Sequence, residues 1–87
     1  MKVLEIKDIV RKDVPIYYRL LYTGIAVLEL VHEPVEKRID FSIEIKPTGQ
    51  KEIIVTLVEP VDYPLVPLVK EIKTFIHHLH STGGLPG

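Results

Sequence analysis

The sequence predicts an α+β domain in which an antiparallel meander sheet of about four to five strands is packed on one face by a single C-terminal helix. Two patterns lead to this prediction. Apolar and polar residues alternate along the first half of residues 38–58, which is the period of a half-buried strand, and apolar residues recur at helical spacing after residue 64. A chain of 87 residues suffices for one two-layer domain.

The C-terminal helix is the clearest element of the sequence. We expect it to begin between Pro64 and Pro67, since proline suits the first turn of a helix, and to end at Gly83. Residues 1–82 then form the domain, and residues 83–87 are predicted to be a flexible tail. The apolar side chains at helical spacing are Leu65, Leu68, Val69, Ile72, Phe75, Ile76 and Leu79.

Residues 38–58 predict a β-hairpin that turns at Pro47-Thr48-Gly49. A three-residue loop with Gly49 in the left-handed conformation sets the register of the two strands. Every inward-facing pair in that register is apolar, which supports the pairing. These pairs are Ile43 with Ile53, Phe41 with Val55 and Ile39 with Leu57.

Residues 16–31 admit two interpretations. One is a pair of strands around Thr23-Gly24, both of whose faces are largely apolar. The other is a single helix, but Gly24 would then lie in its middle and several leucines would fall outside its apolar stripe. The many β-branched and aromatic residues favour strands. Upstream, residues 3–10 predict a short edge strand that ends in a turn over residues 11–13.

The strand interpretation leaves the second face of the sheet uncovered and apolar. Because a large apolar patch rarely faces water in a monomer, we expect a two-fold homodimer that packs sheet on sheet or joins edge strands. The helical interpretation of residues 16–31 would remove this expectation by covering the second face within one chain. The predicted interface residues are Leu21, Ala26, Leu28, Leu30, Ile54 and Val58.

Composition and charge exclude several classes of function. The absence of cysteine excludes disulfides, thiolate zinc sites and cysteine nucleophiles. Charged residues recur every two or three positions over residues 1–8, which is unlike a signal peptide, so we expect a cytoplasmic protein with no membrane partner. A formal net charge of −1 disfavours non-specific nucleic-acid binding. A single-stranded nucleic-acid surface remains an alternative, through Tyr17, Arg19, Lys37, Arg38, Lys46 and Lys51.

Metal and catalytic chemistry are not indicated. The histidines at positions 77, 78 and 80 would lie near the helix C-terminus, where the helix dipole favours cations, and His32 belongs to the opposite end of the predicted fold. The carboxylates Glu33, Glu36, Glu59 and Asp62 gather at strand exits beside basic residues, as solvated loop charge. Nucleophile elbows and phosphate-binding loops are absent from the sequence.

The sequence therefore predicts a noncatalytic, self-associating protein-interaction module without metal or cofactor. Two alternatives stay open. The first is the single-stranded nucleic-acid surface, and the second is a small-ligand or enzymatic site at a subunit interface.

Overall fold

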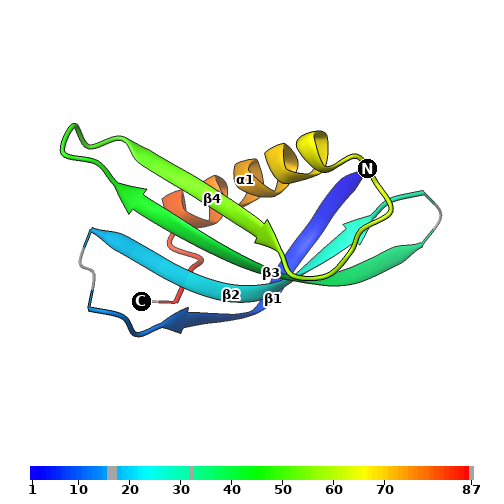
Figure 1. Ribbon diagram of the computed structural model, residues 1–87, viewed down its shortest axis with the longest axis horizontal. Helices are drawn as coiled ribbons and strands as arrows, with labels where there is room; N and C mark the ends of the chain where they lie inside the picture. Colours follow the sequence, from blue (N-terminus) through cyan, green and yellow to red (C-terminus); the bar gives the residue numbers. More distant parts are fainter. Residues whose placement is uncertain (16–17, 32, 87) are drawn as a thin grey trace.

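The computed structural model describes residues 1–15, 18–31 and 33–86. Four strands form one antiparallel sheet in the order β1-β2-β3-β4, and a helix follows them (Figure 1). The predicted α+β class is confirmed. The elements are β1 (Lys2–Lys12), β2 (Arg19–Glu29), β3 (Pro34–Ile45), β4 (Lys51–Leu57) and α1 (Leu65–Ser81).

The predicted hairpin of β3 and β4 is confirmed in its register. Ile43 lies opposite Ile53, and the other two predicted pairs are present as well. Gly49 has a φ of 87°, and the Lys46 N–H donates to the Gln50 carbonyl over 2.8 Å. The loop therefore reverses the chain through a left-handed glycine, as its length requires.

The interpretation of residues 16–31 as a hairpin is wrong, and so is the helical one. Where the structure describes this segment, β2 runs without a turn through Thr23 and Gly24, paired with β1 on one side and β3 on the other. Gly24 is present for a different reason: a Cβ there would lie 3.1 Å from Ile6 Cγ2 and 3.5 Å from Ile9 Cγ1. Glycine in mid-strand thus makes room for the side chains of β1 rather than for a turn.

β1 is longer than predicted. It continues through Arg11 to Lys12, which pairs with Leu21, where the sequence predicted a turn. Its pairing shifts between Val3 and Glu5 and again between Lys7 and Val10, and Asp8 in the second irregularity has a φ of 53°. These bulges bend β1 across β2 at Gly24.

The core lies between α1 and the face of the sheet that we call the inner face. Both edge strands, β1 and β4, come close to α1, so the sheet curls around the helix (Figure 1). Tyr22 and Phe41 stack beneath it with ring centroids 5.0 Å apart. The largest fully buried side chains are Leu28, Ile39, Ile43, Leu68, Ile72 and Ile76.

The predicted ends of the helix are confirmed. Pro64 is its N-cap, and Gly83, with a φ of 74°, follows the C-cap Thr82. The chain then turns back onto the core: the Gly84 N–H donates to the Leu79 carbonyl over 2.8 Å, and Leu85 packs against the buried cluster. The residues after the helix therefore make tertiary contacts that the sequence pattern did not indicate.

Candidate functional site

The face of the sheet opposite α1, which we call the outer face, is the first candidate surface. Because β2 is continuous, its even-numbered residues lie on the inner face, which overturns part of the predicted interface. Ala26 and Leu28 are fully buried in the core, and Leu30 packs against it. These three residues cannot belong to an exposed contact surface.

Leu21, Ile54 and Val58 do lie on the outer face, and strand alternation adds further apolar residues to them. Ile54 and Val58 are 42% and 49% exposed, and Val10 at the β1 edge is 59% exposed. Ile25 and Val27 of β2 lie between them in the rows of the sheet. The apolar part of this face is thus built around other β2 residues than the sequence suggested.

Charged side chains share the outer face with these apolar ones. Lys7 Nζ lies 2.8 Å from Glu36 Oε2, and this hydrogen bond raises the pKa of Lys7. Arg38 Nε lies 3.8 Å from Glu59 Oε1 in a second ion pair. Both signs of charge therefore occur on one face. Of the acidic strand exits, Glu36 and Glu59 serve in these ion pairs.

Two shallow depressions mark the outer face, one of about 150 Å³ and one of about 370 Å³. Asp40 lines both of them. Leu21 and Ile54 border the smaller depression, while Ile25 and Val58 border the larger one. Apolar walls with a polar floor suit contact with another protein surface.

The six residues of the nucleic-acid alternative do not form one surface. Arg19 and Arg38 lie on the outer face beside Glu44 and Glu59. Lys37 pairs with Ala26 and so belongs to the inner-face row. Tyr17 lies outside the described residues. The structure brings together the remaining two, Lys46 and Lys51, at the base of the β3–β4 hairpin.

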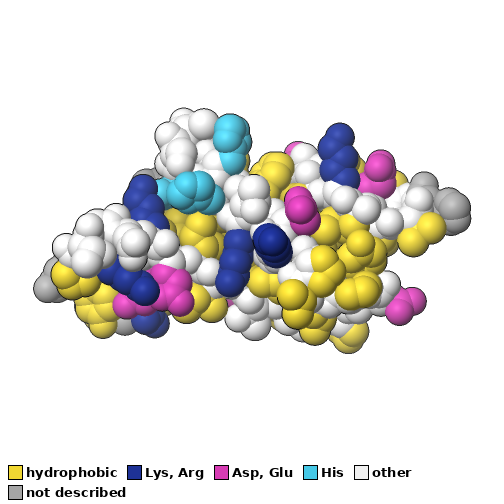
Figure 2. All heavy atoms as spheres, turned by 90° about the horizontal axis from the view of Figure 1, so that it is seen from above, with side chains coloured by type: hydrophobic (Ala, Val, Ile, Leu, Met, Phe, Trp, Pro, Cys, Tyr) yellow, Lys and Arg dark blue, Asp and Glu magenta, His cyan; other side chains and the backbone are white. Residues whose placement is uncertain are grey.

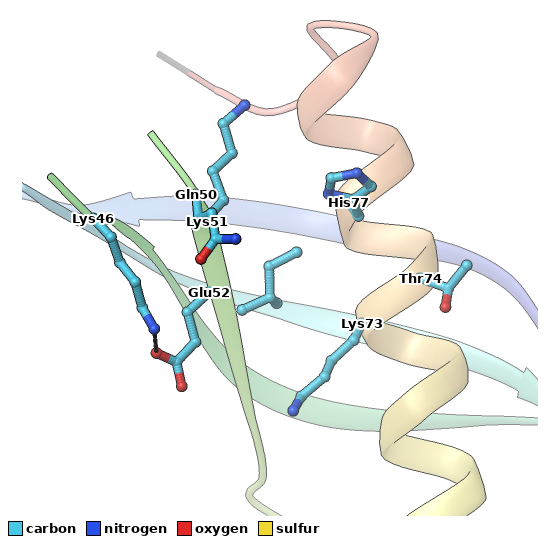
Figure 3. Close-up of a pocket in the computed structure, with 8 residues that line it drawn as sticks. Lys46, Gln50, Lys51, Glu52, Lys73, Thr74 and His77 are labelled. Atoms are coloured by element: carbon cyan, nitrogen blue, oxygen red, sulfur yellow. Dashed lines mark ion pairs between the residues drawn. The ribbon is translucent and has the colours of Figure 1, made fainter. Parts of the chain in front are cut away.

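These two lysines line a groove of about 650 Å³ between β4 and the C-terminal half of α1, which we call the basic groove (Figure 3). The Lys73 side chain extends from α1 toward β4, and Lys46 Nζ lies 3.3 Å from Glu52 Oε2. Lys51 Nζ lies 3.0 Å from His80 Nδ1. The lining residues are Lys46, Gln50, Lys51, Glu52, Ile53, Lys73, Thr74 and His77.

The charge of the basic groove is positive. Burial, and then the charges of Lys51 and His77, lower the pKa of His80, so His80 is neutral at pH 7 and can accept a hydrogen bond from the Lys51 ammonium. Three lysines then face one carboxylate, that of Glu52. The groove is suited to binding an anionic group.

Lys73, Thr74 and His77 were missed as site residues in the sequence. Their spacing on the polar side of the predicted helix was visible, but only the fold shows that this side borders β4. In the view of Figure 2, dark blue and cyan side chains adjoin a yellow hydrophobic area. On α1, Leu65 and Val66 are 55% and 82% exposed, and they line a depression shared with Lys73.

Potential metal ligands do not cluster in the part of the chain that the structure describes. Within residues 1–15, 18–31 and 33–86, no group of three potential metal-ligating side chains comes together. His32, one of the four histidines, lies outside these ranges. The described residues also contain no helix long and apolar enough to cross a membrane.

Fold and surfaces together define a small α+β domain with one covered and one open sheet face. The model of the BB_0187 family matches residues 1–81, and the chain belongs to this family. No curated protein and no solved structure matched the chain.

Proposed function

We propose that this protein is a noncatalytic protein-interaction module that self-associates through the outer face of its sheet. One observation carries the proposal: α1 covers only the inner face, and the outer face presents Val10, Ile54 and Val58 to solvent. Apolar side chains at these exposures lose contact with water when a second surface covers them, which favours association.

The charges of the outer face support a second copy of the chain as the partner. Lys7 and Arg38 lie on this face together with Glu36 and Asp40. In a two-fold interface the same patch meets itself, so a face with both signs of charge can pair with its copy, whereas a face of one sign would repel it.

The expected affinity is modest. Ala26, Leu28 and Leu30 belong to the inner layer, so the apolar area available for contact is smaller than the sequence suggested. Interfaces near the lower end of the range for specific complexes, about 1,200 Å² in total, hold weak or transient partners. We expect a dissociation constant of about micromolar order.

The test is the solution mass by size-exclusion chromatography with light scattering, from about 1 μM to about 500 μM protein, concentrations that bracket the expected dissociation constant. Ile54→Glu places a charge in the middle of the open face, and we expect it to keep the protein monomeric throughout. Val66→Glu is the matched control, since Val66 is more exposed than Ile54 but lies on α1. Circular dichroism checks that both variants fold.

Three results would count against the proposal. The wild type could stay monomeric at the highest concentration, or Ile54→Glu could leave the dimer intact. Loss of the dimer in Val66→Glu alone would transfer the contact surface to α1. A location in the cytoplasm is part of the same proposal and stays a prediction.

A further inference from the structure

The edge of β4 that faces away from β3 offers unpaired backbone groups. β4 is the last strand of the sheet. The Val58 N–H donates to the Arg38 carbonyl over 3.0 Å, and the Gln50 carbonyl accepts from Lys46. In an antiparallel pair such hydrogen-bonded positions alternate along the strand. The even-numbered residues of β4 therefore bond to β3, and the N–H and C=O groups of Lys51, Ile53 and Val55 point to the free edge.

A bond on the other side of β3 agrees with this alternation. The Ile45 N–H donates to the Tyr18 carbonyl over 2.9 Å. Odd-numbered residues of β3 thus point toward β2, and their partners in β4 point the opposite way. The free edge of β4 is therefore assigned from observed bonds at both sides of β3.

The basic groove runs beside the first residues of this free edge. Ile53 and Lys51 belong both to the free edge and to the lining of the groove, and α1 forms the opposite wall (Figure 3). An added strand would lie about 4.8 Å from β4. The groove provides a space of about 650 Å³ at this place.

The charge in the groove is not neutralised within the chain. Glu52, the single carboxylate of the lining, is held by Lys46. Lys51 contacts a histidine, and Lys73 has no ion-pair partner among the described residues. Two lysines on opposite walls are thus available to an anionic occupant.

We propose that an extended acidic segment of a partner protein binds in the basic groove by adding a strand to the free edge of β4. Main-chain hydrogen bonds to Lys51 and Ile53 provide the pairing, as in other cases of strand addition. Side chains of an added strand alternate between its two faces, so those on the α1 side meet Lys51 and Lys73. The geometry calls for carboxylates at every second position of the segment.

A peptide fits the groove better than a nucleic acid does. The lining contains three lysines but no aromatic side chain on which a base could stack. The free N–H and C=O groups of β4, by contrast, match the backbone of an extended peptide. A nucleic acid is therefore an outcome of the test that would overturn the proposal.

The experiment is a fluorescence-anisotropy titration with a labelled eight-residue peptide of alternating glutamate and threonine. We expect saturable binding that weakens with salt, because exposed charges are screened within about 10 Å at 0.1 M ionic strength. Lys73→Gln should weaken binding about tenfold, a loss of about 1.4 kcal/mol. Lys70→Gln is the matched control, since this exposed lysine on the same helix lies outside the groove, and it should change the affinity less than about twofold.

Two further probes separate strand addition from simple charge attraction. The same peptide with N-methyl groups at alternate residues keeps its charge but loses donors, and strand addition predicts that it binds much more weakly. A peptide with lysine in place of glutamate should not bind. Equal binding of the methylated peptide, or no difference between the Lys73 and Lys70 variants, would overturn the proposal.

A single-stranded oligonucleotide of matched charge is the third probe. Tighter binding of the oligonucleotide than of the peptide, with the same dependence on Lys73, would make the groove a nucleic-acid site and overturn the proposal. The inference is independent of self-association through the outer face. Peptide affinity should be the same at protein concentrations below and above the dimer range, and displacement of a dimer by the peptide would show that a second copy occupies the groove instead.

Discussion

The inner and outer faces of the sheet are made by the same four strands but are built on different terms. On the inner face Leu28 and Ile43 are fully buried beneath α1, and their neighbours are apolar throughout. On the outer face Leu21 and Ile54 stand among ion pairs and remain partly exposed. The comparison indicates that the inner face provides most of the stability, which leaves the outer face available for contacts with other molecules.

The largest expected effect compares two leucines of β2 that point to opposite faces. Leu28→Ala removes a fully buried side chain and should lower the free energy of unfolding by about 2–5 kcal/mol. Leu21→Ala, on the half-buried outer face, should cost about 1 kcal/mol or less. Urea denaturation of both variants at low protein concentration measures the difference. Equal losses would mean that the outer face also holds the fold together.

The second effect tests how closely β1 packs against the inner side of β2. Gly24→Ala gains backbone order in the strand, worth about 0.5–1 kcal/mol, but its Cβ would lie 3.1 Å from Ile6 Cγ2. Because Ile6 is itself buried, we expect the crowding to prevail, with a net loss of about 1 kcal/mol. Gly24→Val should cost more. A stabilised Gly24→Ala variant would show that β1 yields easily at its bulge.

These two sites also explain which parts of the fold could be predicted from the sequence. The β3–β4 hairpin was predicted in full register, because a left-handed glycine and an alternating pattern act within a few residues of each other. Thr23-Gly24 has the same local appearance as a turn, but the reason for Gly24 is a side chain of another strand. Local patterns cannot distinguish a glycine that bends its own chain from one that admits a neighbour.

The candidate sites were predictable to a smaller extent for a related reason. One misplaced turn reverses the face of every residue after it, so Ala26 and Leu28 were assigned to the wrong side. The basic groove joins the hairpin to α1 across more than twenty residues of sequence, and Lys73 could be placed beside Lys51 only once the helix was docked. A surface made by two elements has no pattern in either element alone.

A smaller effect is expected from the contact between the inner layer and the C-terminal residues. The Tyr22 hydroxyl donates to the Pro86 carbonyl over 3.4 Å, a long hydrogen bond, while the ring stacks on Phe41. Tyr22→Phe keeps the ring and should lower the free energy of unfolding by about 0.5 kcal/mol. Hydrogen exchange of the Gly84 amide, which bonds to Leu79, should become faster. Unchanged exchange would mean that Leu85 alone holds these residues on the core.

The smallest effect concerns His80, at the margin of the inner layer where α1 meets β4. Burial and the facing charges of Lys51 and His77 lower the pKa of His80 in the folded state below its ordinary value of 6.5. The unfolded chain then binds the proton more readily, so the stability contributed by neutral His80 is present above about pH 6.5 and is lost as the pH falls through the folded-state pKa.

Denaturation midpoints measured between pH 7.5 and pH 5 test this prediction. The wild type should lose stability toward the acidic end, and His80→Gln, which cannot take up a proton, should lose less over the same interval. Parallel pH profiles for the two proteins would place the titration elsewhere and would imply that the margin between α1 and β4 is more open than the inner layer it borders.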